Sequence, residues 1–355
     1  MLNPPPLRSS LICALRLLPT RFSDTRSAAL SPAFPHAPPI PDPFRHLTTR
    51  SLRRPEPAMT FVDKPYGQFL GSAHSFEAAS NILFGIPMDF TCCFRAGTRL
   101  GPREIRYFAD NLEDYSVEQR RSLAEDTFFD AGDLDLPFGN PAACLDVIEE
   151  AVDHILNAGK RPVAMGGEHL VSAGIVRAIA RHFPDAVILH VDAHFDLRHT
   201  YADQELSHAT ALRLCWNALD MSPTDQPPRL VQIGVRSGPA EEAEFAHQHI
   251  PQILTESTSE LISELEKLRD LWGARPVYCT FDIDAVDPAY APGTGTPEPG
   301  GLSSHQALAI ARFLPTFENL VGFDLVETSP PLDHAGITSA LAAKMIREFM
   351  IATQV

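Results

Sequence analysis

The sequence predicts an α/β protein of three layers, in which helices cover both faces of a mainly parallel central sheet. From Met59 onward, short apolar runs typical of buried strands alternate with segments of helical periodicity. Parallel strands need crossover connections, usually helices, and the alternation therefore places helices on both sides of the sheet. Hydrophobic residues make up 44% of the 355 residues, which is enough for a substantial core.

The predicted strands are short apolar runs separated by polar or helical segments. In chain order they are residues 81–86, 127–130, 162–165, 186–191, 230–234, 277–281 and 320–326. The clearest predicted helix spans residues 141–158, with Asn140 as its N-cap, Pro141 at its first position and Gly159 beyond its end. Apolar side chains recur inside it at helical spacing, which assigns them to the core.

The first 58 residues differ in composition from the rest of the chain. They contain eight arginines, no lysine, three acidic residues and twelve of the 32 prolines. Such a segment cannot build a core, and we predict a disordered extension followed by a catalytic domain at residues 59–355. Two explanations of this extension remain open: it is a presequence, or it is sequence upstream of the true start. An arginine- and leucine-rich start is typical of a mitochondrial presequence, whereas Met59 as the true start, which we favour, predicts a cytoplasmic protein.

Composition also narrows the class of partner. The formal net charge of −16 argues against nucleic acid or an anionic membrane and favours a small cationic ligand. The sequence contains no run of about 20 apolar residues of the kind that predicts a membrane span. The six cysteines show no metal-binding or redox spacing, so reduced, buried thiols are expected.

Candidate metal ligands follow three of the predicted strands. They are His169, then Asp192, His194 and Asp196, and finally Asp282 and Asp284. Side chains alternate along an extended chain, so the members of each acidic cluster point to one side if that geometry persists. In folds of this class, ligands bind beyond the carboxyl ends of the strands.

Four aspartates brought close together repel one another, and burying them without partners is costly. Two divalent cations would cancel their formal charge. Four carboxylates and two imidazoles without a cysteine suit Mn²⁺ better than a thiolate-rich zinc site does. Two such ions can share a bridging water and lower its pKa, which gives hydroxide at neutral pH. The alternative is that these residues have only structural roles, such as a turn or a helix cap. This could account for one isolated Asp-x-His motif, but not for three clusters that each lie at a strand end.

These residues resemble the metal-binding motifs of the ureohydrolase (arginase/agmatinase) family, and most closely those of bacterial-type agmatinases. The matching segments are residues 166–169, 192–196 and 281–288, the guanidinium-binding loop 291–301 and the histidine segment 207–210. The resemblance implies an arginase-like fold and two Mn²⁺ ions per subunit. His169, Asp192, Asp196 and Asp282 would hold one ion, and Asp192, His194, Asp282 and Asp284 the other.

The same resemblance implies the catalytic roles. Asp196 would also orient the attacking hydroxide, and His208 would deliver a proton to the leaving amine. Glu298, in a loop rich in Gly and Pro, would accept paired hydrogen bonds from the planar guanidinium. Glu327 matches an acidic position near the metals and would orient ligands. The loop 94–102 resembles a family loop that borders the active site, and its arginines are expected in structural roles or at a subunit contact, not in catalysis.

Substrate choice depends on Arg198, which stands where arginases carry a polar residue that holds the amino-acid head of arginine. Hydrolysis of agmatine to putrescine and urea is the first expectation, followed by aminopropylagmatine. Arg198 is harmless to an amine tail if it points outward or at Glu205. Pointing into the pocket, it would bind a carboxylate tail, as in guanidinobutyrate or formimidoylglutamate.

Two further hypotheses are a catalytically silent polyamine or guanidine binder and a single-zinc deacetylase. Urea release and metal content would distinguish them from a ureohydrolase, for which arginine is another candidate substrate. The resemblance also implies a homo-oligomer, a trimer or a hexamer.

Overall fold

The computed structural model describes residues 61–62, 67–73, 75–124 and 127–354. The predicted extension, residues 1–58, lies outside the described residues. Among the described residues, the main sheet has nine strands in the order β1-β5-β2-β6-β11-β10-β7-β8-β9. Their bounds are β1 Phe61–Val62, β2 Asn81–Gly85, β5 Phe128–Leu134, β6 Arg161–Met165, β7 Val187–Val191, β8 Leu230–Ile233, β9 Gln252–Ile253, β10 Val277–Asp282 and β11 Leu320–Val326.

The pairing confirms a mainly parallel sheet. Only the edge strand β1 pairs antiparallel, with β5, and all other pairs within the described part of this sheet are parallel. A separate two-stranded antiparallel sheet joins β3 (Tyr115–Ser116) and β4 (Arg121–Ser122). All seven predicted strands are present. The sequence missed the two-residue strands β1, β3, β4 and β9, which are too short to show a pattern.

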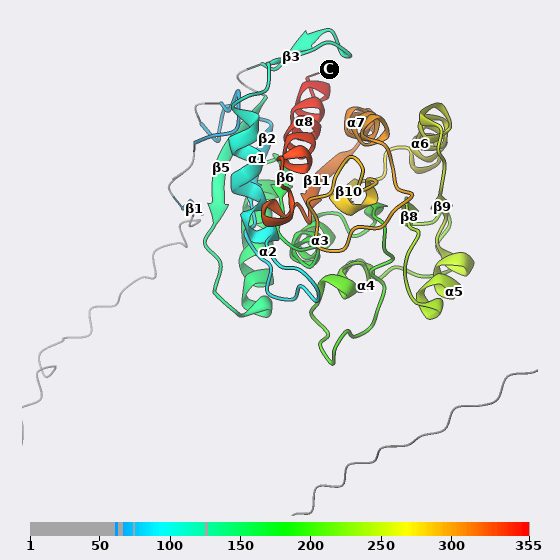
Figure 1. Ribbon diagram of the computed structural model, residues 1–355. Coiled ribbons are helices and arrows are strands. Elements are labelled where there is room, and N and C mark those ends of the chain that lie inside the picture. The colour runs from blue at the N-terminus through cyan, green and yellow to red at the C-terminus, as the bar shows by residue number, and fades with distance from the viewer. Residues whose placement is uncertain (1–60, 63–66, 74, 125–126, 355) are drawn as a thin grey trace, which may run out of the picture. The chain divides into compact units, whose positions relative to one another are not determined.

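Helices cover both faces of the sheet, as predicted (Figure 1). One face packs against α1 (Gly101–Ala109), α6 (Thr258–Trp272), α7 (Ser304–Phe313) and α8 (Ile337–Ala352). The other face packs against α2 (Pro141–Asn157), α3 (Val171–His182), α4 (Ala211–Ala218) and α5 (Ala240–His249).

Strand residues alternate between these two cores. In β7, Val187 and Leu189 belong to the first and Ile188 to the second. Burial on both faces explains why the strands read as continuous apolar runs.

Two local features refine the predicted boundaries. Helix α2 begins as expected, because the Asn140 side chain accepts a hydrogen bond from the backbone N–H of Ala143 (3.2 Å). Strand β5 continues past the predicted end at Asp130, although acidic residues and glycine usually signal a turn. Asp130 is buried there because Arg106 of α1 donates two hydrogen bonds to its carboxylate, each 2.9 Å.

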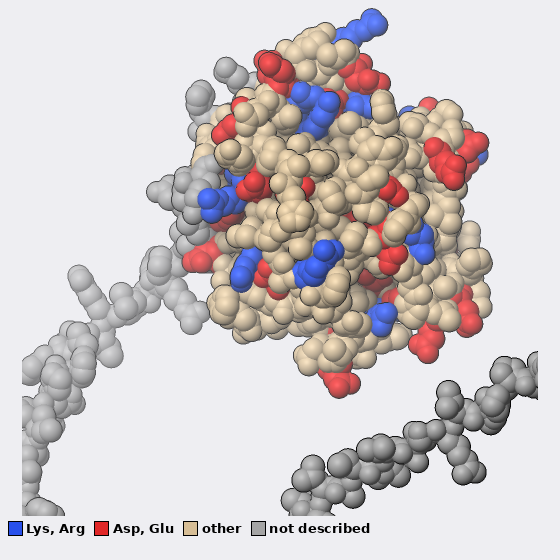
Figure 2. All heavy atoms as spheres, viewed as in Figure 1, with Lys and Arg blue, Asp and Glu red and all other residues tan. Residues whose placement is uncertain are grey.

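The surface is of mixed charge on the face drawn in Figure 2, where basic side chains lie scattered among acidic ones. No helix within the described part of the chain combines the length and the apolarity that crossing a bilayer requires.

Candidate metal centre and active site

Four neighbouring strands, in the order β6-β11-β10-β7, bring the candidate residues to one edge of the sheet. His169 lies four residues beyond β6, Glu327 follows β11, Asp282 ends β10 and Asp192 follows β7. Parallel strands present their carboxyl ends at the same edge, so residues far apart in sequence meet there. The structure gathers all six predicted ligands at this edge.

His169 is oriented so that its Nδ1 atom faces carboxylates. Its Nε2 atom lies 2.9 Å from the Thr280 hydroxyl, which itself donates to Asp324 (2.7 Å). The hydroxyl proton is therefore engaged, and Nε2 must carry the imidazole proton. This leaves Nδ1 with a free lone pair, and the buried atom has no hydrogen-bond partner among the described residues.

Three carboxylate oxygens surround that lone pair. They belong to Asp192 (3.0 Å), Asp196 (3.2 Å) and Asp282 (3.3 Å). Ligand atoms held about 2.1 Å from one octahedral ion are about 3 Å apart, so these spacings suit a shared cation. The unpaired nitrogen and the donor set both fit a metal ion.

A second group of ligands adjoins the first. His194 Nδ1 lies 3.1 Å from Asp284 Oδ2 and 3.5 Å from Asp192 Oδ1. These three residues can converge on one ion. Asp192 directs one oxygen to each group, as expected of a bridging ligand. Asp282 directs Oδ2 to His169, while its Oδ1 accepts from the Asp284 backbone N–H (2.8 Å).

Turns bring the candidate ligands together. The prediction that both acidic clusters keep an extended backbone was therefore wrong in part. Asp284 lies in a 3-10 turn, Ile283–Ala285, directly after β10. Asp196 has a left-handed backbone with φ of 53°, an uncommon conformation for a residue other than glycine. Such outliers concentrate at functional sites. In each cluster, the first aspartate accepts a hydrogen bond from the backbone two residues later. Asp192 Oδ1 accepts from the His194 N–H (2.6 Å), and Asp282 Oδ1 accepts from the Asp284 N–H (2.8 Å).

The cluster is electrostatically unfavourable without cations. Burial, together with repulsion from Asp284 and Asp192, holds the pKa of Asp282 well above its ordinary value. Burial and Asp192 likewise raise the pKa of Asp284. Protonation or cation binding relieves such repulsion, and at neutral pH divalent cations do so while the carboxylates stay ionised.

His190 is a buried neighbour of this cluster that the sequence interpretation missed. Its Nε2 atom lies 2.8 Å from Asp192 Oδ2, and its Nδ1 lies 2.9 Å from Gln232 Nε2. The Gln232 amide also donates to the Phe195 carbonyl (3.0 Å), which fixes its orientation. His190 therefore accepts from Gln232 and donates to Asp192. Its position two residues before Asp192 on a strand was the available signal, since i and i+2 share a face.

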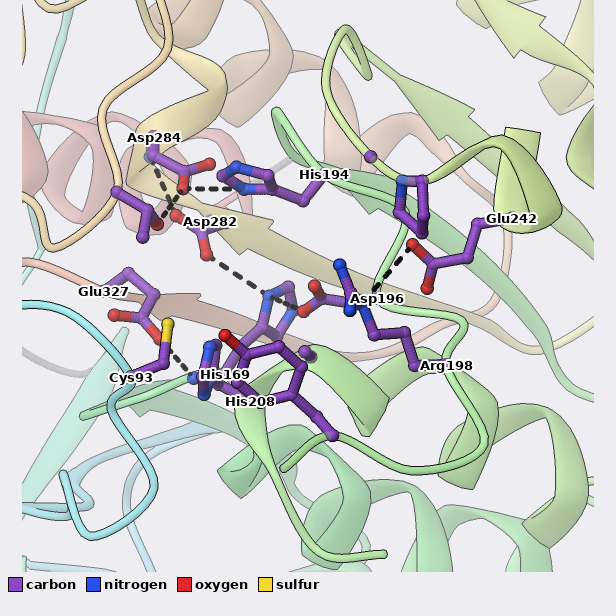
Figure 3. A pocket seen from close by; sticks show the side chains of 15 residues that line it. Cys93, His169, His194, Asp196, Arg198, His208, Glu242, Asp282, Asp284 and Glu327 are labelled. Atoms are coloured by element: carbon purple, nitrogen blue, oxygen red, sulfur yellow. Dashed lines mark hydrogen bonds and ion pairs between the residues drawn. The ribbon is translucent and has the colours of Figure 1, made fainter. Parts of the chain in front are cut away.

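A pocket of about 170 Å³ opens over the cluster, and several side chains project into it (Figure 3). His208 lies on its wall with Nδ1 2.8 Å from the Thr91 carbonyl. A carbonyl only accepts, so Nδ1 carries the proton and Nε2 of the neutral ring offers a lone pair. Burial lowers the pKa of His208 below its ordinary value, which favours this neutral form.

The two candidate glutamates occupy different places. Glu327 lines the pocket, is buried, and accepts a hydrogen bond from the His169 backbone N–H through Oε1 (2.8 Å). Its φ is 62°, a second left-handed residue at the site. Glu298 is not among the lining residues; its side chain is 37% exposed, and Oε1 lies 3.9 Å from His194 Nε2.

The loop that carries Glu298 is held by two arginines. Arg236 donates to the backbone carbonyls of Glu298 (2.6 Å) and Asp284 (2.7 Å), which joins the loop to the metal ligands. Arg95 donates to the carbonyl of Gly295 (3.1 Å), in the structural role expected for the loop 94–102. Nothing in the local sequence around Arg236 signals this function.

Arg198 lines the pocket and pairs with an acidic residue that sequence analysis did not find. Its Nε atom lies 3.9 Å from Glu242 Oε2, and its guanidinium stacks 4.9 Å from the Tyr201 ring centroid. Of the orientations considered, the structure therefore places Arg198 in the pocket wall, paired with Glu242 and not with Glu205. The other carboxylate oxygen of Glu242 accepts from the Leu197 N–H (2.8 Å). Glu242 comes from α5, more than forty residues away.

The sequence profile of the arginase family matches residues 79–352. The chain belongs to the arginase family. An agmatinase of Bacillus subtilis (strain 168) is 44% identical over 284 residues, covering 80% of this chain and 95% of that protein. A guanidinobutyrase of Pseudomonas aeruginosa is 34% identical over 300 residues, covering 82% of this chain and 91% of that protein.

The crystal structure of an agmatine ureohydrolase of Thermoplasma volcanium superposes with a TM-score of 0.71 at 32% identity, covering 82% of this chain and 95% of that one. Arginase-family membership and the arginase fold confirm the expectation of a ureohydrolase enzyme.

Proposed function

We propose that the protein is an agmatinase, which binds two Mn²⁺ ions and hydrolyses agmatine to putrescine and urea. The supporting observation is a set of six His and Asp ligands beneath a pocket that also holds a buried, partly unpaired carboxylate. Among the described residues, Glu327 receives one hydrogen bond, at Oε1. A planar guanidinium would offset the cost of burying this carboxylate through charge-assisted hydrogen bonds.

The residues of the site divide the reaction between them. When bound, the two ions would supply a water of lowered pKa and positive charge against the developing negative charge. Asp196 orients the attacking water toward the guanidinium carbon, and Glu327 holds the guanidinium. The free Nε2 of His208 accepts a proton and returns it to the nitrogen that leaves as the amine of putrescine.

The part of the pocket wall formed by Arg198 and Glu242 supports an amine-tailed substrate. An isolated Arg198 would repel the terminal ammonium of agmatine and attract the carboxylate of guanidinobutyrate. Glu242 compensates that charge across 3.9 Å and adds a carboxylate to the same wall. The names of the relatives agree with agmatine as the first choice, since the relative of 44% identity is an agmatinase.

Urea release from a panel of substrates tests the proposal. Protein loaded with Mn²⁺ should release urea from agmatine with a higher kcat/KM than from arginine, guanidinobutyrate or aminopropylagmatine, and no formamide from formimidoylglutamate. Preference for guanidinobutyrate would replace agmatine with a carboxylate-tailed substrate. Metal binding without turnover of any member of the panel would favour a silent guanidine binder.

A further inference from the structure

Glu168 belongs to the same motif as His169 but does not face the metal ligands. Its buried carboxylate turns to the loop after β2, where it accepts from the backbone N–H groups of Phe90 (2.9 Å) and Thr91 (2.9 Å) and from the Thr91 hydroxyl (2.5 Å). The Glu168 N–H also donates to the Met88 carbonyl (2.7 Å). Glu168 therefore fixes the loop through both its backbone and its side chain.

Thr91 in turn makes two contacts to His208. Its hydroxyl accepts from the His208 backbone N–H (2.9 Å), and its carbonyl accepts from the His208 ring at Nδ1 (2.8 Å). The Thr91 hydroxyl has one proton, which goes to Glu168, so its lone pair is available to His208. The hydrogen bonds thus run in one direction, from His208 through Thr91 to Glu168.

We propose that Thr91 is the positioning residue of His208 and that Glu168 serves proton transfer by fixing Thr91. This inference rests on the proposed function, which gives His208 its role. The Thr91 carbonyl keeps one proton on Nδ1 throughout, so a second proton, taken from the attacking water, can enter and leave only at Nε2. That proton passes to the leaving nitrogen, and the ring returns to its neutral form.

The first test compares two substitutions of Thr91. Thr91→Val keeps the side-chain shape and the backbone contacts, but its side chain can neither donate to Glu168 nor accept from the His208 N–H, whereas Thr91→Ser keeps both of these side-chain hydrogen bonds. Thr91→Val should lower kcat for agmatine roughly ten- to a hundredfold, the usual cost of removing an outer orienting group, with a smaller change in KM. Thr91→Ser should restore kcat to near the unsubstituted value. Both variants should retain their metal content, measured by elemental analysis.

A double-mutant cycle separates positioning from general loop structure. Thr91→Val introduced into His208→Asn should cause no further loss of kcat, because the group that Thr91 positions is already gone. Equal losses in the two backgrounds, or a Thr91→Ser variant as slow as Thr91→Val, would overturn the inference.

If Thr91→Val does not fold, Glu168→Gln tests the same coupling. It keeps the size and one acceptor of the side chain, and its kcat loss should likewise vanish in the His208→Asn background. Failure of the unsubstituted protein to release urea from any member of the panel would overturn the proposed function itself. Urea release with additive losses would overturn only the role of Thr91.

Discussion

At the scale of single residues, two glutamates are candidates for binding the proposed guanidinium substrate, and they form a matched pair for experiment. Glu327 is buried beside His169 in the pocket, whereas Glu298 is partly exposed and lies outside its lining. We expect Glu327→Gln to lower kcat/KM for every guanidino substrate about ten- to a hundredfold, the value of a charge-assisted hydrogen bond of about 1.5–3 kcal/mol. Glu298→Gln should cost much less. A larger loss in Glu298→Gln would restore the sequence-based assignment.

We expect Arg198 to influence the choice of substrate tail through its pairing with Glu242. Arg198→Ala releases the Glu242 carboxylate, so the ratio of kcat/KM for agmatine to that for guanidinobutyrate should rise. Metal content should not change, because Arg198 contacts no predicted ligand side chain among the described residues. Arg181→Ala on the surface of α3 is the matched control. An unchanged ratio would show that other residues select the substrate tail.

At the scale of elements, strand positions could be predicted because burial on both faces leaves a continuous apolar run. Turns were harder. The 3-10 turn that carries Asp284 and the left-handed backbone of Asp196 depend on neighbouring strands, not on local pattern. Glu242 and Arg236 were missed for a related reason: their contacts join segments more than forty residues apart. His190, by contrast, stood two residues before Asp192 and could have been found.

The loop after β2 gives an element-scale prediction. A Cβ atom on Gly167 would lie 1.8 Å from the Met88 carbonyl oxygen, so Gly167→Ala must displace the loop that carries Thr91. We expect both a lower Tm and a lower kcat. Gly159→Ala is the control, because its Cβ meets nothing within 4 Å but its φ is +69°. It should lower stability by roughly 1 kcal/mol and leave kcat unchanged. Unaltered kcat in Gly167→Ala would show that the loop tolerates displacement.

At the scale of the whole molecule, the candidate metal centre joins the carboxyl ends of strands that lie far apart in the sequence. The candidate ligands come from the segments after β6 and β7 and from the end of β10. The family motifs pointed to all six candidate ligands, and each motif lies at the end of an apolar strand. Thr91 carries no such signal, since its partners Glu168 and His208 meet it only in the folded protein.

Removal of metal should therefore destabilise the whole domain. Chelation leaves four aspartates with mutual repulsion, whereas two ions at a hundredfold excess over Kd would each add about 2.7 kcal/mol. We expect Tm to fall on the order of 10 °C on chelation and to recover when Mn²⁺ is added. His208→Asn should show the same fall, because His208 is not a ligand. Asp192→Ala lacks the carboxylate that faces both His169 and His194, so its Tm should change little on chelation. A stoichiometry of one ion per chain, or a Tm indifferent to complete metal removal, would contradict a binuclear centre that ties these strands together.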